Sequence, residues 1–351
     1  MSRDDRGPSL VPVLPGSRPR SILMIAALVA LPLIGIVGAI VLWKASDAKN
    51  RAEESKFTYD ESAVVNVDPS LVKYQQVERI DTGLKSARAI ALDRAGRLYV
   101  AGDRKLLVLT SVTTRPTTAP AFSELSLPDT PNAVCIAPDG SIYLAMREHV
   151  EVYDAMGRHK ASWPTLGEQS YLTSIAVTED RVWLADYGRK VLVACTPSGR
   201  VVFEAGRADK AMNYDGLAVP SPHMDVAVDA NGDAWVANPG RCRLEKFDRG
   251  GHFVRMWGKP GGTVDGFYGC CNPCEFALLS DGRFVTAEKG VPRVRIFSST
   301  GQFECFVAPP RAFAQEFEGF DMAVDAQDRI LILQRPGNVV RVFAPVDGGT
   351  R

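Results

Sequence analysis

The feature that most constrains the fold is a repeat that occurs six times from residue 86 onward. Each copy has a short apolar run, a turn rich in Asp and Gly, a second apolar run, a polar turn and a third run. The centres of the first turns lie 44, 40, 52, 50 and 46 residues apart, at Gly96, Gly140, Asp180, Gly232, Gly282 and Asp328. Repeats of this length, built from a few short strands, are typical of β-propeller blades, which bury their faces by stacking on one another. We therefore predict an all-β fold, a six-bladed β-propeller.

A count of strands predicts how the ring closes. Five of the six copies are followed by a predicted fourth strand, and these strands cover residues 122–127, 157–163, 199–205, 251–257 and 301–307. The sixth copy, which ends at Ala344, has no such strand after it. The segment KYQQVERI at 73–80 precedes the first copy and has the composition of an outer strand. We expect it to complete the last blade, because a closed ring leaves no open sheet edge between its first and last repeats.

The repeat resembles a known family. The segment HMDVAVDANGDAWVANPGRCRLEKFDRGGHFVRMWG, residues 223–258, is similar to the NHL repeat, with its apolar-Asp-x-x-Gly, apolar-Ala and Gly-x-Phe elements. The resemblance covers about residues 73–346. It implies a six-bladed propeller that binds or scaffolds other molecules. The same architecture is also found in lactonases, lyases and relatives of the amidating lyases, so the fold alone does not decide the function.

The first 72 residues differ from the repeats. Residues 21–43 contain no charged side chain, and a helix of that length spans about 34 Å, enough to cross a bilayer core of about 30 Å. A cleaved signal peptide is the alternative, although its apolar region usually has only about 7–15 residues. We predict a single-pass signal anchor, preceded by a polar tail at 1–20 and followed by a stalk at 44–72. The propeller at 73–346 is then exported, and residues 347–351 form a short tail.

The charge of the chain excludes one class of partner. Lys and Arg together number 41, and so do Asp and Glu, which gives no net charge. A nucleic-acid-binding protein needs a positive field over the phosphates. We therefore expect no nucleic-acid partner, and instead a protein partner on a loop-bearing face of the propeller.

Cysteines form the most unusual motif. Three of the seven lie in the pentapeptide CCNPC, as Cys270, Cys271 and Cys274, in the loop that leads into the fifth repeat. Cys242 lies on a turn of the fourth repeat that emerges on the same face of a propeller. Four thiols on one rim suit zinc or an iron–sulfur cluster, but they equally suit disulfides in an exported domain. Inert thiols are the third possibility. Of the remaining cysteines, Cys135 and Cys195 lie within predicted strands and are expected to be small core residues, whereas Cys305 lies on an outer strand with no expected role.

A second candidate site follows from aligning the repeats. Asp225, Glu275 and Asp321 begin the inner strands of the fourth, fifth and sixth repeats, which line the central channel. Three carboxylates at one level suit Ca²⁺ or a cationic group. Alternatively, they accept hydrogen bonds from backbone amides of neighbouring loops. The first three repeats offer Ala89, Cys135 and Ser174 at that level, which weakens a calcium-dependent lactonase site.

Three functional hypotheses remain from the sequence. The first is a binding or scaffold module, favoured by the fold and by the lack of a catalytic motif. The second is a redox or metal accessory protein that uses Cys242, Cys270, Cys271 and Cys274. The third is a divalent-metal hydrolase of the lactonase type that uses Asp225, Glu275 and Asp321.

Overall fold

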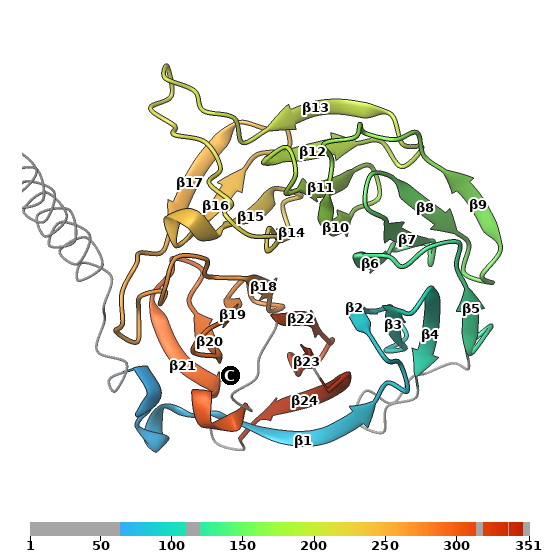
Figure 1. Cartoon of the computed structure of the whole chain (residues 1–351). Helices are drawn as coiled ribbons and strands as arrows, with labels where there is room; N and C mark the ends of the chain where they lie inside the picture. Colours follow the sequence, from blue (N-terminus) through green and yellow to red (C-terminus); the bar gives the residue numbers. More distant parts are fainter. Residues whose placement is uncertain (1–63, 110–119, 314–318, 336, 347–351) are drawn as a thin grey trace, which may run out of the picture. The chain divides into compact units, whose positions relative to one another are not determined.

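Six four-stranded antiparallel sheets surround a central axis in the computed structural model of the chain (Figure 1). The structure describes residues 64–109, 120–313, 319–335 and 337–346. These residues belong to the second of two units into which the chain divides, which begins at residue 59. The predicted all-β, six-bladed propeller is confirmed.

Each sheet is one blade, and five of the six blades use four strands that are consecutive in sequence. Blade 1 consists of β2 (Ala87–Leu92), β3 (Leu98–Gly102), β4 (Lys105–Leu109) and β5 (Glu124–Ser126). Blade 2 consists of β6 (Ala133–Ile136), β7 (Ile142–Ala145), β8 (Val150–Tyr153) and β9 (His159–Ser162). Blade 3 consists of β10 (Leu172–Val177), β11 (Val182–Asp186), β12 (Val191–Cys195) and β13 (Val201–Ala205). Blade 4 consists of β14 (Val226–Val228), β15 (Ala234–Asn238), β16 (Arg243–Phe247) and β17 (Phe253–Trp257). Blade 5 consists of β18 (Glu275–Leu278), β19 (Phe284–Glu288), β20 (Arg293–Phe297) and β21 (Phe303–Ala308).

The sixth blade is built from both ends of the propeller. It contains β22 (Gly319–Val324), β23 (Ile330–Arg335), β24 (Val339–Pro345) and, as its outer strand, β1 (Tyr74–Asp81). β1 is antiparallel to β24, with Tyr74 opposite Pro345 and Asp81 opposite Val339. The described residues also form three short 3₁₀ helices outside the sheets: η1 (Pro69–Leu71), η2 (Pro239–Arg241) and η3 (Pro310–Ala312).

The hydrophobic core is divided among the interfaces between blades. Each of six clusters of buried side chains joins one blade to the next, and one of them joins blade 6 to blade 1 through Leu331, Leu333, Leu98 and Val100. The second strand of a blade has neighbours on both faces, so all residues of β3 and β11 are buried, including Asp186 at the end of β11. This arrangement explains why a single blade cannot fold alone.

Aromatic side chains pack on glycines across four of these interfaces. In each case the glycine lies in the turn before the outer strand of one blade, and the ring comes from the outer edge of the preceding blade. A Cβ atom added at these glycines would lie 2.4–3.0 Å from a ring atom. The pairs are Gly157 with Phe122, Gly199 with Trp163, Gly251 with Phe203, and Gly301 with Trp257.

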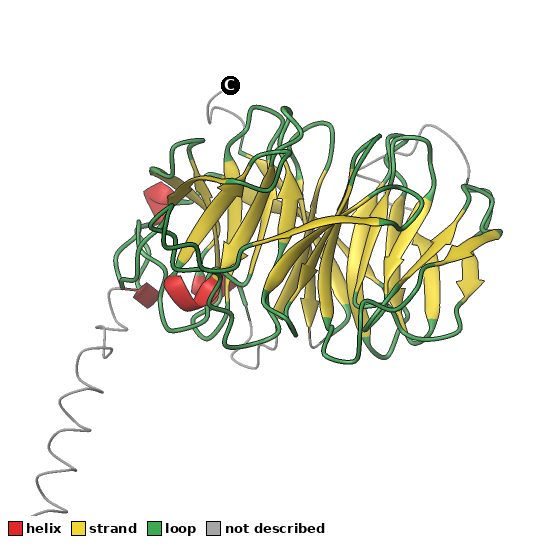
Figure 2. Ribbon diagram, turned by 90° about the horizontal axis from the view of Figure 1, so that it is seen from above, coloured by secondary structure: helices red, strands yellow, loops and turns green. Residues whose placement is uncertain are grey.

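The antiparallel order of strands defines two faces of the propeller, which are seen edge-on in Figure 2. One face carries the loops that enter each blade and the turns between second and third strands; we call it the loop face. The opposite face, here the turn face, carries the tight turns between first and second strands. Inner strands therefore start at the loop face, so Asp225, Glu275 and Asp321 lie at that mouth of the central channel.

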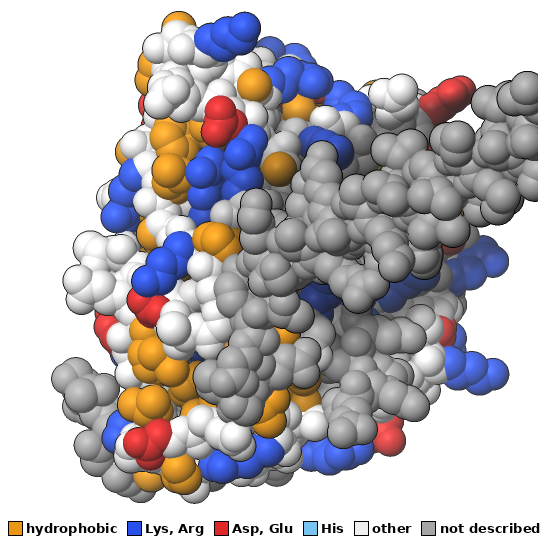
Figure 3. Space-filling view, turned by 60° about the vertical axis from the view of Figure 1, so that its left-hand side comes forward, with side chains coloured by type: hydrophobic (Ala, Val, Ile, Leu, Met, Phe, Trp, Pro, Cys, Tyr) orange, Lys and Arg blue, Asp and Glu red, His pale blue; other side chains and the backbone are white. Residues whose placement is uncertain are grey.

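The outer surface of the ring is mixed in character. Figure 3 shows hydrophobic side chains beside Lys and Arg on the side of the propeller that holds β17 and β21. On β17, the exposed residues Val254 and Met256 flank Arg255.

The predicted membrane anchor at 21–43 lies outside the described residues. In the part of the chain that the structure does describe, no helix has the length and apolar character needed to cross a membrane.

Candidate functional site

Two long loops rise on the loop face at blades 3 to 5. The first, residues 206–225, joins β13 to β14, and the second, residues 258–274, joins β17 to β18. Loops longer than about 12–15 residues without strands or helices of their own are uncommon in compact domains unless they carry function. The second loop contains Cys270, Cys271 and Cys274, so the cysteine motif lies on this face.

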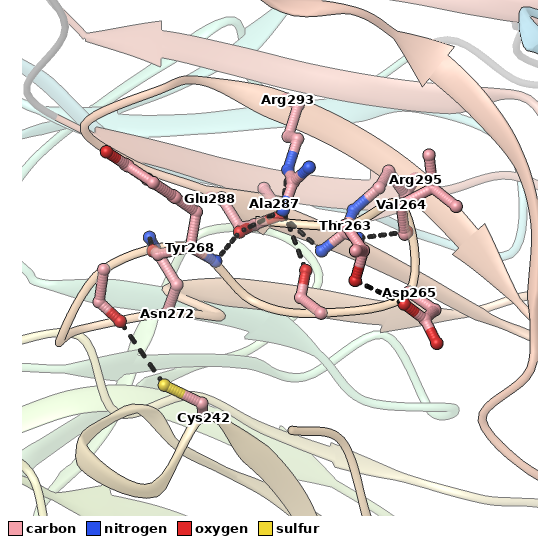
Figure 4. Close-up of polar contacts among 12 residues, drawn as sticks. Cys242, Thr263, Val264, Asp265, Tyr268, Asn272, Ala287, Glu288, Arg293 and Arg295 are labelled. Atoms are coloured by element: carbon pink, nitrogen blue, oxygen red, sulfur yellow. Dashed lines mark hydrogen bonds and ion pairs between the residues drawn. The ribbon is translucent and has the colours of Figure 1, made fainter. Parts of the chain in front are cut away.

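Glu288, the last residue of β19, anchors the second loop (Figure 4). Its Oε2 accepts a hydrogen bond from the Tyr268 backbone N–H at 2.7 Å, and its Oε1 pairs with Arg293 Nε at 2.7 Å and with Arg295. Arg293 in turn donates to the Gly266 carbonyl at 2.8 Å, and Arg295 donates to the Val264 carbonyl at 2.5 Å. Burial lowers the pKa of Arg295 to about 9. All three charged side chains are buried, so the loop is fixed by ionic contacts inside the protein.

A related network anchors the first loop. Glu245 on β16 is buried and accepts hydrogen bonds from the Tyr214 hydroxyl and the Asn238 amide, both at 2.7 Å. Asn238, which ends β15 as Glu288 ends β19, accepts a hydrogen bond from the Ala218 backbone N–H at 2.9 Å. Burial and the neighbouring Glu245 raise the pKa of Tyr214 far above its usual value. The last residue of the second strand therefore holds the incoming loop in both blades.

The structure brings three of the four rim cysteines together. The sulfurs of Cys270 and Cys271 lie 3.4 Å apart, and Cys242 donates its S–H to the carbonyl of Gly269, the residue before Cys270, at 3.4 Å. Cys274 is separate: it belongs to the core between blades 5 and 6 and donates to the Ala287 carbonyl at 3.3 Å. The four thiols thus do not converge as a tetrahedral zinc or iron–sulfur site requires.

All seven cysteines are free thiols in this structure. Burial, with the nearby Glu288, raises the pKa of Cys242 to about 11, and burial raises the pKa of Cys274 well above its usual range. The pKa of Cys270 is raised first by its interaction with the Cys271 thiol and then by partial burial. Within the described residues, no group of three or more His, Cys, Asp or Glu side chains is arranged to hold a metal ion.

The channel carboxylates are engaged by the protein itself. Asp225 accepts hydrogen bonds from Ser174 Oγ at 2.6 Å and from the backbone N–H of Phe276, in the next blade, at 2.8 Å. Asp321 accepts one from the backbone N–H of Ile90, again in the next blade, at 2.6 Å. Both carboxylates therefore link neighbouring inner strands, which is the alternative to calcium binding that the sequence left open.

Glu275 lies between these two carboxylates and interacts with both. Burial and the charges of Asp225 and Asp321 raise the pKa of Glu275 well above its usual range. Burial also raises the pKa of Asp321 to about 7, and it raises the pKa of Asp225. Like charges that are close together disfavour one another's ionisation, so the three carboxyl groups bind protons more readily than isolated carboxyl groups do.

Cationic groups lie above the carboxylates at the channel mouth. Arg335 donates to the Phe320 carbonyl at 2.7 Å, and Lys289 Nζ lies 3.1 Å from Ser221 Oγ. Burial and the charges of Lys289 and Arg335 lower the pKa of His223 to about 4, which keeps its imidazole neutral. The Arg335 Nε atom is buried and has no hydrogen-bond partner in the described residues.

One predicted alignment needs correction. Asp225, Glu275 and Asp321 lie across from Ala237, Ala287 and Leu333 of their second strands. In blade 2 the equivalent position, across from Ala145, is held by Ala133, whereas Cys135 lies across from Tyr143. The turn glycines show the same offset, since the position lies seven residues before Gly96, Gly140, Gly232 and Gly282. Alignment on these glycines therefore places Ala133, and not Cys135, at the level of Ala89.

The loop anchors were not predicted from the sequence. Glu288, Arg293 and Arg295 occupy positions in β19 and β20 that sequence patterns assign to exposed side chains, because isolated charges are rarely buried. The one available signal was the clustering of charged residues in an otherwise apolar blade, because Glu288 ends one strand and Arg293 and Arg295 flank Val294 in the next.

Comparison with known proteins supports the fold. No family model matches the chain, and no curated protein matches it, so the NHL resemblance stays a prediction. A streptogramin B lyase structure matches with a TM-score of 0.54 and 9% identity, covering 80% of this chain and 100% of that one. The WD40 propeller domain of Doa1 matches with a TM-score of 0.52 and 12% identity, covering 79% and 98%. Virginiamycin B lyase from Staphylococcus aureus matches with a TM-score of 0.51 and 12% identity, covering 78% and 89%. At these identities the likeness shows a shared propeller fold and nothing about activity.

Proposed function

We propose that this chain is a binding module, anchored in a membrane by residues 21–43, that recognises a protein partner with its loop face. The observation that carries the proposal is the fixing of loops 206–225 and 258–274 by buried polar networks. Fixed loops lose little conformational entropy when a partner binds, so preorganisation increases affinity. Binding residues are often placed on loops that a rigid scaffold positions.

The tips of the two loops have suitable chemistry for a protein partner. Met212, in the first loop, is 57% exposed, and Val264, in the second, is 40% exposed. Charged side chains surround them, including Lys210 and Lys259. Methionine is enriched in protein interfaces, whose apolar centres are surrounded by polar rims.

The channel favours this proposal over a calcium-dependent hydrolase. Asp225 and Asp321 already accept hydrogen bonds from backbone amides of the next blade, so their oxygens link neighbouring blades. A calcium ion takes six to eight oxygen ligands, which would have to replace these bonds. The channel carboxylates therefore act in holding inner strands together.

Site-specific photocrosslinking tests the proposal. A photoreactive amino acid is placed at Met212 or Val264 on the loop face, and at Asn231 or Thr300 on the turn face as matched controls, in the full chain expressed in its own cells. We expect one protein adduct that both loop positions share and both turn positions lack. Adducts formed equally well from the turn face, or from no position at all, would contradict the proposal.

Fractionation tests the anchor separately. The full chain should sediment with membranes, and deletion of residues 21–43 should release the propeller into the soluble fraction. A chain that stays soluble with residues 21–43 intact would show that these residues do not act as an anchor.

A further inference from the structure

We propose that Cys270 and Cys271 form a redox-active dithiol on the loop face, which reacts with an accessible disulfide and closes to a bond between the two neighbouring sulfurs. The two sulfurs are already in contact at 3.4 Å. Cys270 is exposed and Cys271 is partly exposed, whereas every other cysteine is buried or lies within a strand. Cys270 is therefore the thiol that an outside disulfide reaches first.

The loop holds this pair in place from both sides. Two residues before the pair, the Tyr268 backbone N–H donates a hydrogen bond to the Glu288 carboxylate (Figure 4). Immediately after the pair, the Asn272 amide donates to the Lys289 carbonyl at 3.0 Å and to the Tyr268 carbonyl at 2.5 Å, and Asn272 Oδ1 accepts from the Lys289 N–H at 2.9 Å. The two cysteines thus lie in a short segment that is held at both ends, which keeps their sulfurs close together near the surface.

The other nearby thiols are not suited to exchange. Cys242 is buried against the Gly269 carbonyl, and Cys274 is turned into the core, where its S–H bonds the Ala287 carbonyl. Because both sulfurs are buried, an outside disulfide cannot reach them as it can reach the exposed Cys270. Exchange is therefore confined to Cys270 and Cys271.

The geometry favours a reversible reaction over a permanent cross-link. Adjacent Cα atoms are about 3.8 Å apart, below the range of about 4.4–6.8 Å that disulfides usually span. A bond between neighbouring residues is therefore strained, and strained, exposed disulfides are the easily reduced ones. Such a bond suits electron exchange better than it suits stabilisation of the fold.

The reaction balances as two successive exchanges. The Cys270 thiolate attacks one sulfur of the incoming disulfide, releases one thiolate and forms a mixed disulfide. The Cys271 thiolate then attacks Cys270 Sγ, forms the bond between the two residues and releases the second thiolate. The two protein thiols are oxidised by two electrons, the disulfide is reduced to two thiols, and the two protons leave the cysteines for the products.

Reaction with one equivalent of an aromatic disulfide, 5,5′-dithiobis(2-nitrobenzoate), tests the proposal on the reduced full-length chain. The wild type should release two equivalents of thionitrobenzoate and keep no adduct, and mass spectrometry should place the new bond between Cys270 and Cys271. Cys270→Ser should lose most of the rapid reaction. Cys271→Ser should release one equivalent and keep the adduct on Cys270, because the second attack is lost. Cys305→Ser, which removes a buried thiol of β21, is the matched control and should behave as the wild type.

Several results would overturn the proposal. They are a wild type that stops at one equivalent with a stable adduct, a bond that maps to Cys242 or Cys274, and two equivalents released by Cys271→Ser. Urea unfolding midpoints establish that each variant is folded before its reaction is compared. If a serine variant is unfolded, the alanine variant at the same position takes its place.

Discussion

Individual glycines reveal how tightly the blades pack. Gly301 and Gly282 both have left-handed backbone conformations, with φ of 87° and 84°. A Cβ atom at Gly301 would meet Trp257 at 2.6 Å, whereas one at Gly282 would meet nothing within 4 Å. The two positions thus share the same backbone strain and differ in packing.

We predict that Gly301→Ala destabilises the propeller more than Gly282→Ala does. The left-handed conformation costs a non-glycine residue about 1–2 kcal/mol at either position, and overpacking adds about 1–3 kcal/mol at Gly301 alone. Urea unfolding of the two variants measures the difference. Equal losses of stability would show that the Trp257 ring moves away freely.

The protonation of Asp321 predicts how stability depends on pH. Its pKa in the folded chain is about 7, above the ordinary value of 3.8, so between these values the folded state holds a proton that the unfolded state has lost. The free energy of unfolding should therefore fall as pH rises from about 4 to 7. Glu275, whose pKa is also raised, contributes in the same direction.

We expect Asp321→Asn to flatten this dependence, because the amide does not titrate. The slope of the unfolding free energy against pH isolates the effect from any loss of the hydrogen bond to Ile90. Asp215→Asn, at an exposed loop position, is the control and should keep the wild-type slope. A variant of Asp321 with an unchanged slope would contradict the protonated cluster.

At the scale of single elements, the loop anchors are the parts most sensitive to substitution. Glu288→Gln would leave the charges of Arg293 and Arg295 buried without a carboxylate. Removing one partner from a buried ion pair typically costs about 3–5 kcal/mol. We predict a loss of this size in urea unfolding, with loop 258–274 becoming sensitive to proteolysis.

Glu304→Gln is the matched control for that prediction. Glu304 pairs with Arg283 at 3.1 Å on the partly exposed outer surface of the same blade. Exposed pairs contribute about 0–1 kcal/mol, so the control should unfold close to the wild type. A comparable loss from both substitutions would mean that burial of Glu288 has no special effect.

The elements differ in how far the sequence predicts them. Alternating apolar residues and a regular spacing of turns predict the blades, because each blade must bury its faces against its neighbours in the same way. Whether the Cys274 side chain points into the core or toward the rim is not predictable in this way, since it depends on the residue at which β18 begins. The charged anchors escape prediction for another reason: a buried Arg295 is stable only with Glu288 beside it, and that pairing exists only in the folded chain.

At the scale of the whole molecule, the ring depends on β1. The structure places Tyr74 opposite Pro345, and the Val346 N–H donates to the Lys73 carbonyl at 2.9 Å. The end of β24 therefore lies beside the start of β1, in the arrangement of a β-hairpin that lacks its turn.

A circular permutant tests this closure. Truncation of residues 1–81 should leave β24 with an unpaired edge and cause aggregation or loss of cooperative unfolding. Moving residues 73–81 to follow residue 346 through a two-residue Asn-Gly turn should restore the fold, because such turns join antiparallel strands tightly. Size-exclusion chromatography and circular dichroism report both results. A truncated chain that unfolds as the wild type does would show that β1 is dispensable.

The position of β1 also means that this strand is synthesised long before its partner strand, β24. Arg341 binds Gln76 across this last pair of strands, although 265 residues separate the two in the chain. At ribosomal rates of about 5–20 residues per second, β1 emerges roughly 13–50 s before its partner exists. During that interval the backbone N–H and C=O groups of β1 have no β24 to pair with. Its polar side chains, with Gln75, Gln76 and Arg79 at exposed positions, reduce mispairing during that interval, because charged and polar edges resist pairing with the wrong strand.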